Sequence, residues 1–181
     1  MLFVNNSSKA KKMQLVAVCR KKIVSWFILK NNLYAEIIED IKKTGPDPNK
    51  IYPNENIRQV VFIKNVVKRT NIVVGDYTYY DDPDGAEKFE EHVTHHYDFL
   101  GDRLVIGKFC AIARGIEFVM NGANHRMRSV TTYPFNIMGG GWEKFSPKLK
   151  DLPFKGDTVV GNDVWIGQNV TVMPGVHIGD G

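Results

Sequence analysis

Aliphatic residues recur every six positions in the last part of this chain. The leading residues of four successive units are Val160, Ile166, Val172 and Ile178. Glycine follows three of them, and the fifth places hold Val164, Val170 and Val176. An earlier block keeps the same phase, with leading residues Ile106, Ile112 and Phe118 and fifth-place residues Cys110 and Ile116. One more unit opens at Val74. A period held over so many units predicts a repeat architecture.

A period of six matches neither the 3.6 residues of a helical turn nor the two-residue alternation of a free-standing strand. It predicts short strands separated by tight turns. Wound three units per turn, such strands form a triangular prism in which the leading and fifth-place residues point inward. Stacked coils stabilise one another, and full burial of each aliphatic side chain is worth roughly 1.5 to 3 kcal/mol. The predicted fold class is therefore mainly β, a parallel solenoid.

Two segments interrupt the repeats. Residues 81–102 form a polar excursion, and residues 121–157 form a 37-residue break that is rich in glycine, proline and aromatic residues. A break of that length in a regular solenoid is uncommon unless it has a function. We therefore expect a long projecting loop that carries the chemistry. Before the first coil, residues 60–80 predict strands, and residues 45–53 predict a turn-rich linker with three prolines.

Charge is distributed unevenly along the chain. Residues 1–44 carry nine basic and three acidic residues, whereas the rest carries fifteen and seventeen. The sequence pI near 9.0 therefore comes from outside the repeats, and a basic nucleic-acid-binding face has no support. Asn32 is a candidate cap for a short helix whose apolar face holds Leu33, Ile37 and Ile41. We expect a basic, partly helical extension over 1–44 and a repeat domain over 45–181.

Hydropathy and cysteine usage favour a cytoplasmic protein. The most apolar run near the start, Ile23 to Leu29, has seven residues, whereas a membrane span needs about 20. No clear small-residue cleavage pattern follows it, which disfavours a signal peptide. The chain has two cysteines, Cys19 and Cys110, and Cys110 falls at an inward place where a small apolar residue is needed. A disulfide is therefore not expected, as is usual in a reducing compartment.

His125 is the only histidine of the long break. Imidazole titrates near neutral pH, so it can take a proton from a hydroxyl whose oxygen attacks an acyl carbon. The alternative is a structural histidine that fixes the loop by hydrogen bonds. The position of His125 at the start of the break favours the catalytic interpretation.

A second histidine cluster lies in the excursion. His92, His95 and His96 have a spacing that can supply metal ligands. No cysteine accompanies them, however, and Glu90 and Glu91 lie beside them, so a solvated loop fits better. Trp165 occupies an outward place of its unit. An indole there is either a surface or interface aromatic or a wall for a ligand that lies along the coil.

Several segments together resemble xenobiotic acetyltransferases of the left-handed parallel β-helix type, most closely the streptogramin A (virginiamycin) O-acetyltransferases. The similar segments are GPDPNKIYP (45–53), IGKFCAI (106–112), MNGANHRM (120–127), YPFN (133–136), GWEK (141–144), KGDTVVGNDVWIG (155–167) and MPGVHIGDG (173–181). Hexads alone are shared by many acyltransferases. Hexapeptide-coil proteins also include zinc hydratases that use three histidines, which leaves a metal site open as an alternative. The NGANHRM, YPF and GWEK combination is much narrower.

The resemblance implies a homotrimer with its active sites between neighbouring prisms, and acetyl-CoA as a co-substrate rather than a bound cofactor. It implies His125 as the general base, Tyr80 and Tyr97 as acceptor-binding residues, and Trp165 as a contact near the pantetheine or thioester end of the donor. It implies no metal. The acceptor is expected to be a streptogramin A, with chloramphenicol or another xenobiotic alcohol as alternatives.

The chain departs from that family at both ends. The family's sequences begin near Gly45 and continue past the GDG at 179–181 with further coils and a helical segment. A solenoid needs a terminal cap, so we expect this chain to assemble poorly and to have little activity. A truncated, non-catalytic remnant is therefore an alternative to an active enzyme.

Overall fold

The structure is a computed structural model that describes residues 44–181, of which 46–181 form one compact unit. The expected helix capped by Asn32, and Cys19, lie outside the described residues. Cys110 is buried as expected, is not in a disulfide, and donates its thiol to the carbonyl of Gly161 at 3.1 Å.

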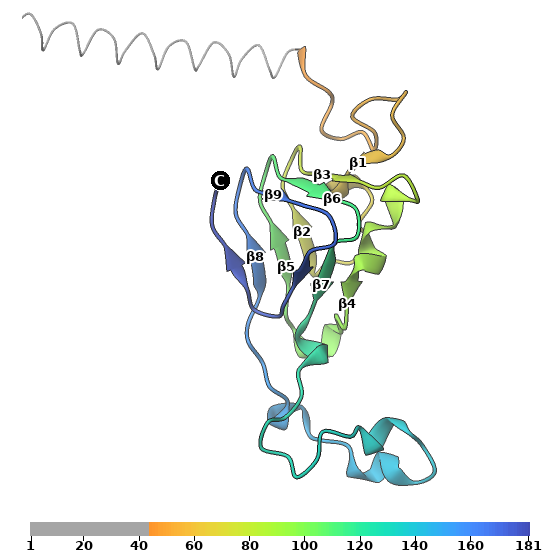
Figure 1. The fold of residues 1–181 in the computed structure, drawn as a ribbon, viewed down its shortest axis with the longest axis vertical. Coiled ribbons are helices and arrows are strands. Elements are labelled where there is room, and N and C mark those ends of the chain that lie inside the picture. Colours follow the sequence, from red (N-terminus) through yellow and green to blue (C-terminus); the bar gives the residue numbers. More distant parts are fainter. Residues whose placement is uncertain (1–43) are drawn as a thin grey trace, which may run out of the picture. The chain divides into compact units, whose positions relative to one another are not determined.

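The hexads form three sheets of short strands (Figure 1). One sheet joins β2 (Ile72–Val74), β5 (Leu104–Ile106), β8 (Thr158–Val160) and β11 (His177–Ile178) in parallel. A second joins β3 (Tyr79–Asp81), β6 (Ala111–Ala113) and β9 (Trp165–Ile166), with β1 (Val60–Phe62) antiparallel to β3. The third joins β4 (Val93–Thr94), β7 (Glu117–Val119) and β10 (Thr171–Val172). The predicted fold, a left-handed parallel β-helix, is confirmed.

Inward hexad places form the core. The leading residues Ile106, Ile112, Phe118, Val160, Ile166 and Val172 are all at most 5% exposed. Fifth-place residues differ by coil: Cys110, Ile116 and Val164 are buried, whereas Val170 and Val176 are each 37% exposed. The expectation that every fifth place is buried is therefore wrong for these two valines. Both lie in the last hexads, Val170 directly before β10 and Val176 directly before β11.

The second hexad place is glycine because successive coils approach closely there. A Cβ added to Gly107 would lie 2.3 Å from the carbonyl oxygen of Gly161 on the next coil. The turn that follows each glycine holds a residue with positive φ, namely Tyr77, Phe109 and Asp163 on successive coils. The rings of Tyr77 and Phe109 stack at 5.1 Å, so the same turn geometry repeats along one corner of the prism.

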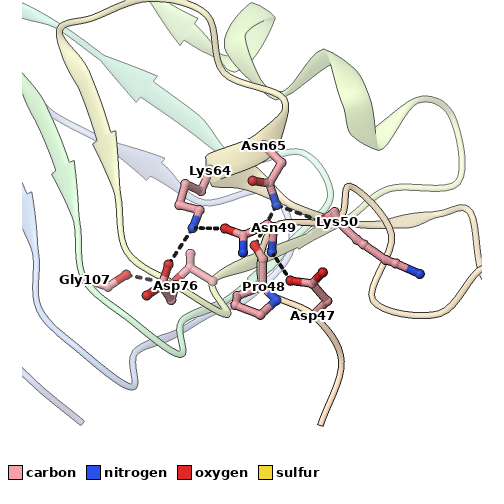
Figure 2. A network of polar contacts seen from close by, with 9 residues as sticks. Asp47, Pro48, Asn49, Lys50, Lys64, Asn65, Asp76 and Gly107 are labelled. Carbon is pink, nitrogen blue, oxygen red and sulfur yellow. Dashed lines mark hydrogen bonds and ion pairs between the residues drawn. The ribbon is translucent and has the colours of Figure 1, made fainter. Parts of the chain in front are cut away.

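Within the segment expected as a linker (45–53), residues 48–50 instead pack against the first coil (Figure 2). Asn65 donates its side-chain amide to the carbonyls of Pro48 and Lys50, at 2.8 and 2.6 Å. Lys64 forms an ion pair of 2.7 Å with Asp76 and also donates to the Asn49 side chain. A turn-rich composition therefore described the local backbone of this segment correctly but missed its packing.

Short 3-10 helices occur before the first coil and within both interruptions. They are η1 (Ile63–Asn65), η2 (Ala86–His92), η3 (Asp98–Leu100), η4 (Asn121–Ala123), η5 (Phe135–Ile137), η6 (Trp142–Phe145) and η7 (Leu149–Asp151). The described residues contain no helix that is long and apolar enough to cross a bilayer.

The excursion over 81–102 is more than a polar loop. Phe89 of η2 is fully buried, and its ring contacts those of Tyr80 and Phe118 at centroid distances of 5.4 and 6.2 Å. The excursion also supplies strand β4 to the third sheet. It therefore closes the first coil, because its few apolar residues reach the core while most of its charged residues face water; Asp82 and Asp102 are buried exceptions.

The break over 121–157 projects between β7 and β8 as expected (Figure 1). Its aromatic residues contact one another: Phe135 meets Tyr133 at 4.7 Å and Trp142 at 5.1 Å between ring centroids. These three side chains nevertheless remain 40 to 51% exposed. The loop is therefore held together by its own side chains, and it leaves apolar surface accessible.

Candidate active site

His125 lies at the start of the projecting loop, just after η4, and its side chain is exposed. The backbone before it is fixed to the coil: Met120 donates its N–H to the carbonyl of Thr94 at 3.0 Å, and Gly122 donates to that of His95 at 3.1 Å. A rigid element thus ends two residues before an accessible imidazole. The imidazole of His125 is thus accessible to a ligand and follows a backbone segment that hydrogen bonds hold to the coil.

Tyr97 packs against the same turn. A Cβ added to Gly122 would lie 2.4 Å from a carbon of the Tyr97 ring, so the ring covers the backbone three residues before His125. Tyr97 also stacks on Phe99 at 5.4 Å and is 45% exposed. The structure therefore brings Tyr97 close to the segment that carries His125 and leaves part of its ring free to contact a ligand.

The two ends of the loop are joined by side-chain amides, which we call the root clasp (Asn121, Asn124, Lys155 and Gly156). Asn121 is 2% exposed. Its carbonyl oxygen accepts the backbone N–H of Lys155 at 2.8 Å and the amide of Asn124 at 3.1 Å, and its own amide donates to the carbonyl of Gly156 at 2.8 Å. Asn124 directly precedes His125, so the root clasp fixes the backbone on which the imidazole stands.

Trp165 is 81% exposed on β9. Strand register places it beside Ala111 of β6, which in turn pairs with Tyr79 of β3. Neighbouring strands lie about 4.8 Å apart, so Tyr79 and Trp165 stand roughly 10 Å apart on one outward row with a small alanine between them. This row of outward residues, called the aromatic row (Tyr79, Ala111 and Trp165), could contact a narrow, extended ligand that lies across the coils.

Tyr80 is fully buried and has no surface with which to contact an acceptor, so direct acceptor binding does not fit this chain's geometry. Its hydroxyl donates to Asp82 at 2.9 Å and lies 3.1 Å from the Nε2 atom of His92. Burial, followed by the hydrogen bond to Asp82, raises the pKa of the Tyr80 hydroxyl above its ordinary range. The outward neighbour Tyr79 was missed by the sequence analysis. Tyr80 lies six residues after Val74, a leading-place phase that marks it as inward.

The three clustered histidines have different partners. His92 lies beside Tyr80 and Asp82, His96 is 8% exposed and bonds the carbonyl of Asp102 at 2.9 Å, and His95 is exposed with a φ of 53°. The expected solvated loop is therefore wrong for His96, which is buried. Within residues 44–181, no group of three or more histidine, cysteine or carboxylate side chains is arranged to hold a metal ion.

The candidate residues fall into two groups on different sheets. His125 and Tyr97 lie by the end of β7, in the sheet of β4, β7 and β10, whereas the aromatic row lies on the sheet of β3, β6 and β9. Among the described residues, no hydrogen bond or ring contact joins the two groups. The described residues therefore give no direct contact between the pair His125 and Tyr97 and the aromatic row.

Comparison with known proteins covers the repeat-bearing part of the chain. The family profile described as "Bacterial transferase hexapeptide (six repeats)" matches residues 157–181. A "Probable macrolide acetyltransferase" of Lysinibacillus sphaericus is 68% identical over 101 residues, which is 56% of this chain and 56% of that protein. A "Virginiamycin A acetyltransferase" of Staphylococcus aureus is 56% identical over 112 residues, 62% of this chain and 50% of that protein.

A "Chloramphenicol acetyltransferase" of Agrobacterium fabrum is 44% identical over 117 residues, 64% of this chain and 56% of that protein. The chain spans about half the length of the curated relatives it matches. The match to the hexapeptide profile agrees with the stacked hexapeptide coils. The predicted resemblance is confirmed, and this chain is related to the hexapeptide-repeat xenobiotic acetyltransferases.

Proposed function

We propose that this chain forms part of an O-acetyltransferase that moves the acetyl group of acetyl-CoA to a hydroxyl of an antibiotic and so inactivates it. The observation that carries the proposal is the exposed imidazole of His125, held beside Tyr97 at the root of a loop on hexapeptide coils. The names of three relatives, each an acetyltransferase of an antibiotic, support it.

In the proposed reaction, the His125 imidazole takes the proton of the acceptor hydroxyl as the oxygen attacks the thioester carbonyl carbon. The new C–O bond forms, the C–S bond breaks, and the departing CoA sulfur takes the proton back from the imidazolium. The products are the acetyl ester and free CoA thiol, and His125 returns to its neutral form. Base catalysis and the fixed proximity of both substrates lower the barrier without an acyl-enzyme.

The remaining candidates divide between the two substrates. Tyr97 supplies an aromatic wall for the acceptor beside His125, and Trp165 contacts the pantetheine end of acetyl-CoA along the aromatic row. The two groups lie on different sheets of one chain and share no contact among the described residues, which supports a site completed by a second copy. We therefore place the site in the cleft between adjacent subunits of a homotrimer, with closed threefold symmetry.

The acceptor of first choice is a streptogramin A, as the motif combination and the virginiamycin A acetyltransferase relative suggest. A macrolide is the second candidate, because the relative named a probable macrolide acetyltransferase shares 68% identity with this chain. Chloramphenicol is the third. The reaction belongs to the cytoplasm, where acetyl-CoA is available and where a free buried thiol such as that of Cys110 stays reduced.

The test is the release of free CoA thiol from acetyl-CoA by the purified protein, measured with each of the three antibiotics and without any. An active enzyme gives antibiotic-dependent release, even at a low rate, and acetylated product by mass spectrometry, whereas the alternative of a non-catalytic remnant gives neither. Replacing His125 by alanine lowers the rate about a hundredfold or more, because the base is lost. His177→Ala is the matched control, since His177 is also exposed but lies on β11. Equal rates in the two variants would overturn the role of His125.

A further inference from the structure

Asp102 is a fully buried carboxyl just before β5. Its Oδ2 atom accepts two hydrogen bonds from Asn121, one from the backbone N–H at 3.0 Å and one from the side-chain amide at 2.9 Å. No described basic side chain forms an ion pair with it, and its Oδ1 atom has no hydrogen-bond partner among the described residues. Burying a carboxyl with an unpartnered oxygen is costly. Stability of the coil is therefore a poor reason for an aspartate at this position.

The hydrogen bonds of Asp102 connect the segment that carries His125 to the segment that carries Tyr97. Its side chain holds Asn121, the central residue of the root clasp, four positions before His125. Its backbone carbonyl accepts a hydrogen bond of 2.9 Å from the Nε2 atom of His96, the residue before Tyr97. The buried ring of His96 and the buried amide of Asn121 thus meet at one residue. A displacement of Asp102 would move these two segments relative to each other.

We propose that Asp102 is the positioning residue that sets the geometry between His125 and Tyr97. The proposal rests on the function proposed above for His125, and it adds that Asp102 acts through the root clasp rather than by touching a substrate. Removing the carboxyl frees the Asn121 amide, loosens both ends of the loop and lets the imidazole leave its productive position. A misplacement of about 1 Å costs as much as a hundredfold in rate.

The first measurement is independent of activity. Hydrogen–deuterium exchange followed by mass spectrometry is compared between the unmodified chain, Asp102→Ala and Asp102→Asn, in peptides that cover the two loop roots. We expect about tenfold faster exchange of the Asn121 and Lys155 amides in Asp102→Ala, because their hydrogen bonds are lost or loosened. Asp102→Asn keeps an acceptor oxygen, so its effect is smaller. Exchange within β5, β8 and β11 stays unchanged.

Asp180→Asn is the matched control. Asp180 also accepts the backbone N–H and the side-chain amide of a single asparagine, Asn162, at 2.6 and 3.2 Å, but it is exposed and lies away from the loop. The control tests whether the loop also loosens when an aspartate–asparagine hydrogen bond is weakened elsewhere in the chain. Exchange at the loop roots that does not change in Asp102→Ala, or that rises equally in Asp180→Asn, overturns the proposal. If Asp102→Ala does not fold, Asp102→Asn against Asp180→Asn carries the same comparison.

The second measurement uses acetyl transfer. Asp102→Ala lowers kcat about 10- to 100-fold and leaves the KM for acetyl-CoA unchanged, and Asp102→Asn recovers part of the loss. In a His125→Ala background, Asp102→Ala causes no further loss, because it acts through that imidazole. An equal loss with and without His125 overturns the positioning role. Absence of any acetyl transfer by the unmodified chain counts against the proposed function, while the exchange result still decides whether Asp102 holds the loop.

Discussion

Tyr79 and Tyr80 are neighbours in β3 that face opposite sides of the sheet. Successive side chains of a strand alternate in direction, and register aligns Tyr80 with the core residue Ile112 while Tyr79 aligns with Ala111. Tyr80 thus occupies a leading hexad place, in phase with Val74. The sequence contained this signal, because the phase that identifies inward residues also separates the two tyrosines. The resemblance pointed to Tyr80, whose side chain is buried, whereas the outward side chain of this strand is Tyr79.

We predict that Tyr80→Phe destabilises the fold by about 1 to 3 kcal/mol, because Asp82 loses the buried hydroxyl that donates to it. The KM for the acceptor stays unchanged, since Tyr80 has no exposed surface. Tyr79→Phe is the matched control and should leave the free energy of unfolding nearly unchanged. Urea unfolding measures the first quantity and initial rates the second. A raised KM in Tyr80→Phe with normal stability would restore Tyr80 as a direct contact.

The raised pKa of Tyr80 adds a pH dependence to the same comparison. The folded chain keeps the hydroxyl protonated above pH 10, whereas the unfolded chain releases that proton near its ordinary pKa of 10.0. The stability due to this group is therefore complete below about pH 10 and falls above it, by about 1.4 kcal/mol per pH unit. The stability advantage over Tyr80→Phe should shrink between pH 9 and pH 11 in urea unfolding. A constant difference would contradict the shift.

At the scale of elements, hexad phase predicted the strands because each unit buries a leading residue in a stack of identical coils. Ile106, Ile112 and Phe118 begin three successive units and are all buried. The hexad phase did not predict that η2 packs on the core, because Phe89 reaches the core from a segment that has no six-residue repeat. It also could not predict the root clasp. Asn121 bonds Lys155 and Gly156, which lie 34 and 35 residues away, and no local pattern encodes such a contact.

Val164 and Val176 occupy the same fifth place in different coils, yet Val164 is 5% exposed and Val176 is 37% exposed. We predict that Val164→Ala costs about 2 kcal/mol of unfolding free energy, because it leaves a cavity in the core. Val176→Ala, the matched control, should cost less than about 1 kcal/mol. Urea unfolding of both variants measures the difference. Equal costs would mean that hexad place, rather than stacking of neighbouring coils, decides how much a valine contributes.

At the scale of the whole molecule, the proposal that the site is shared between subunits makes a prediction about assembly. If His125 of one subunit works with Trp165 of its neighbour, a defect in one part can be complemented by the other part from a different chain. His125→Ala and Trp165→Ala are each expected to be nearly inactive alone. When both are co-expressed and mix at random, about a quarter of the subunit boundaries combine an intact imidazole with an intact indole.

Activity of the mixture should therefore approach about a quarter of that of the unmodified protein, whereas the two variants purified separately and combined without exchange should stay inactive. The reasoning depends only on where the residues lie: the loop root and the aromatic row are on different sheets of one chain. The control mixture is His177→Ala co-expressed with Trp165→Ala. Every chain in it keeps His125, so its activity shows what simple mixing with Trp165→Ala does when no complementation of His125 is needed. No recovery in the first mixture would mean that one subunit supplies both side chains, and it would remove the structural reason for a trimer.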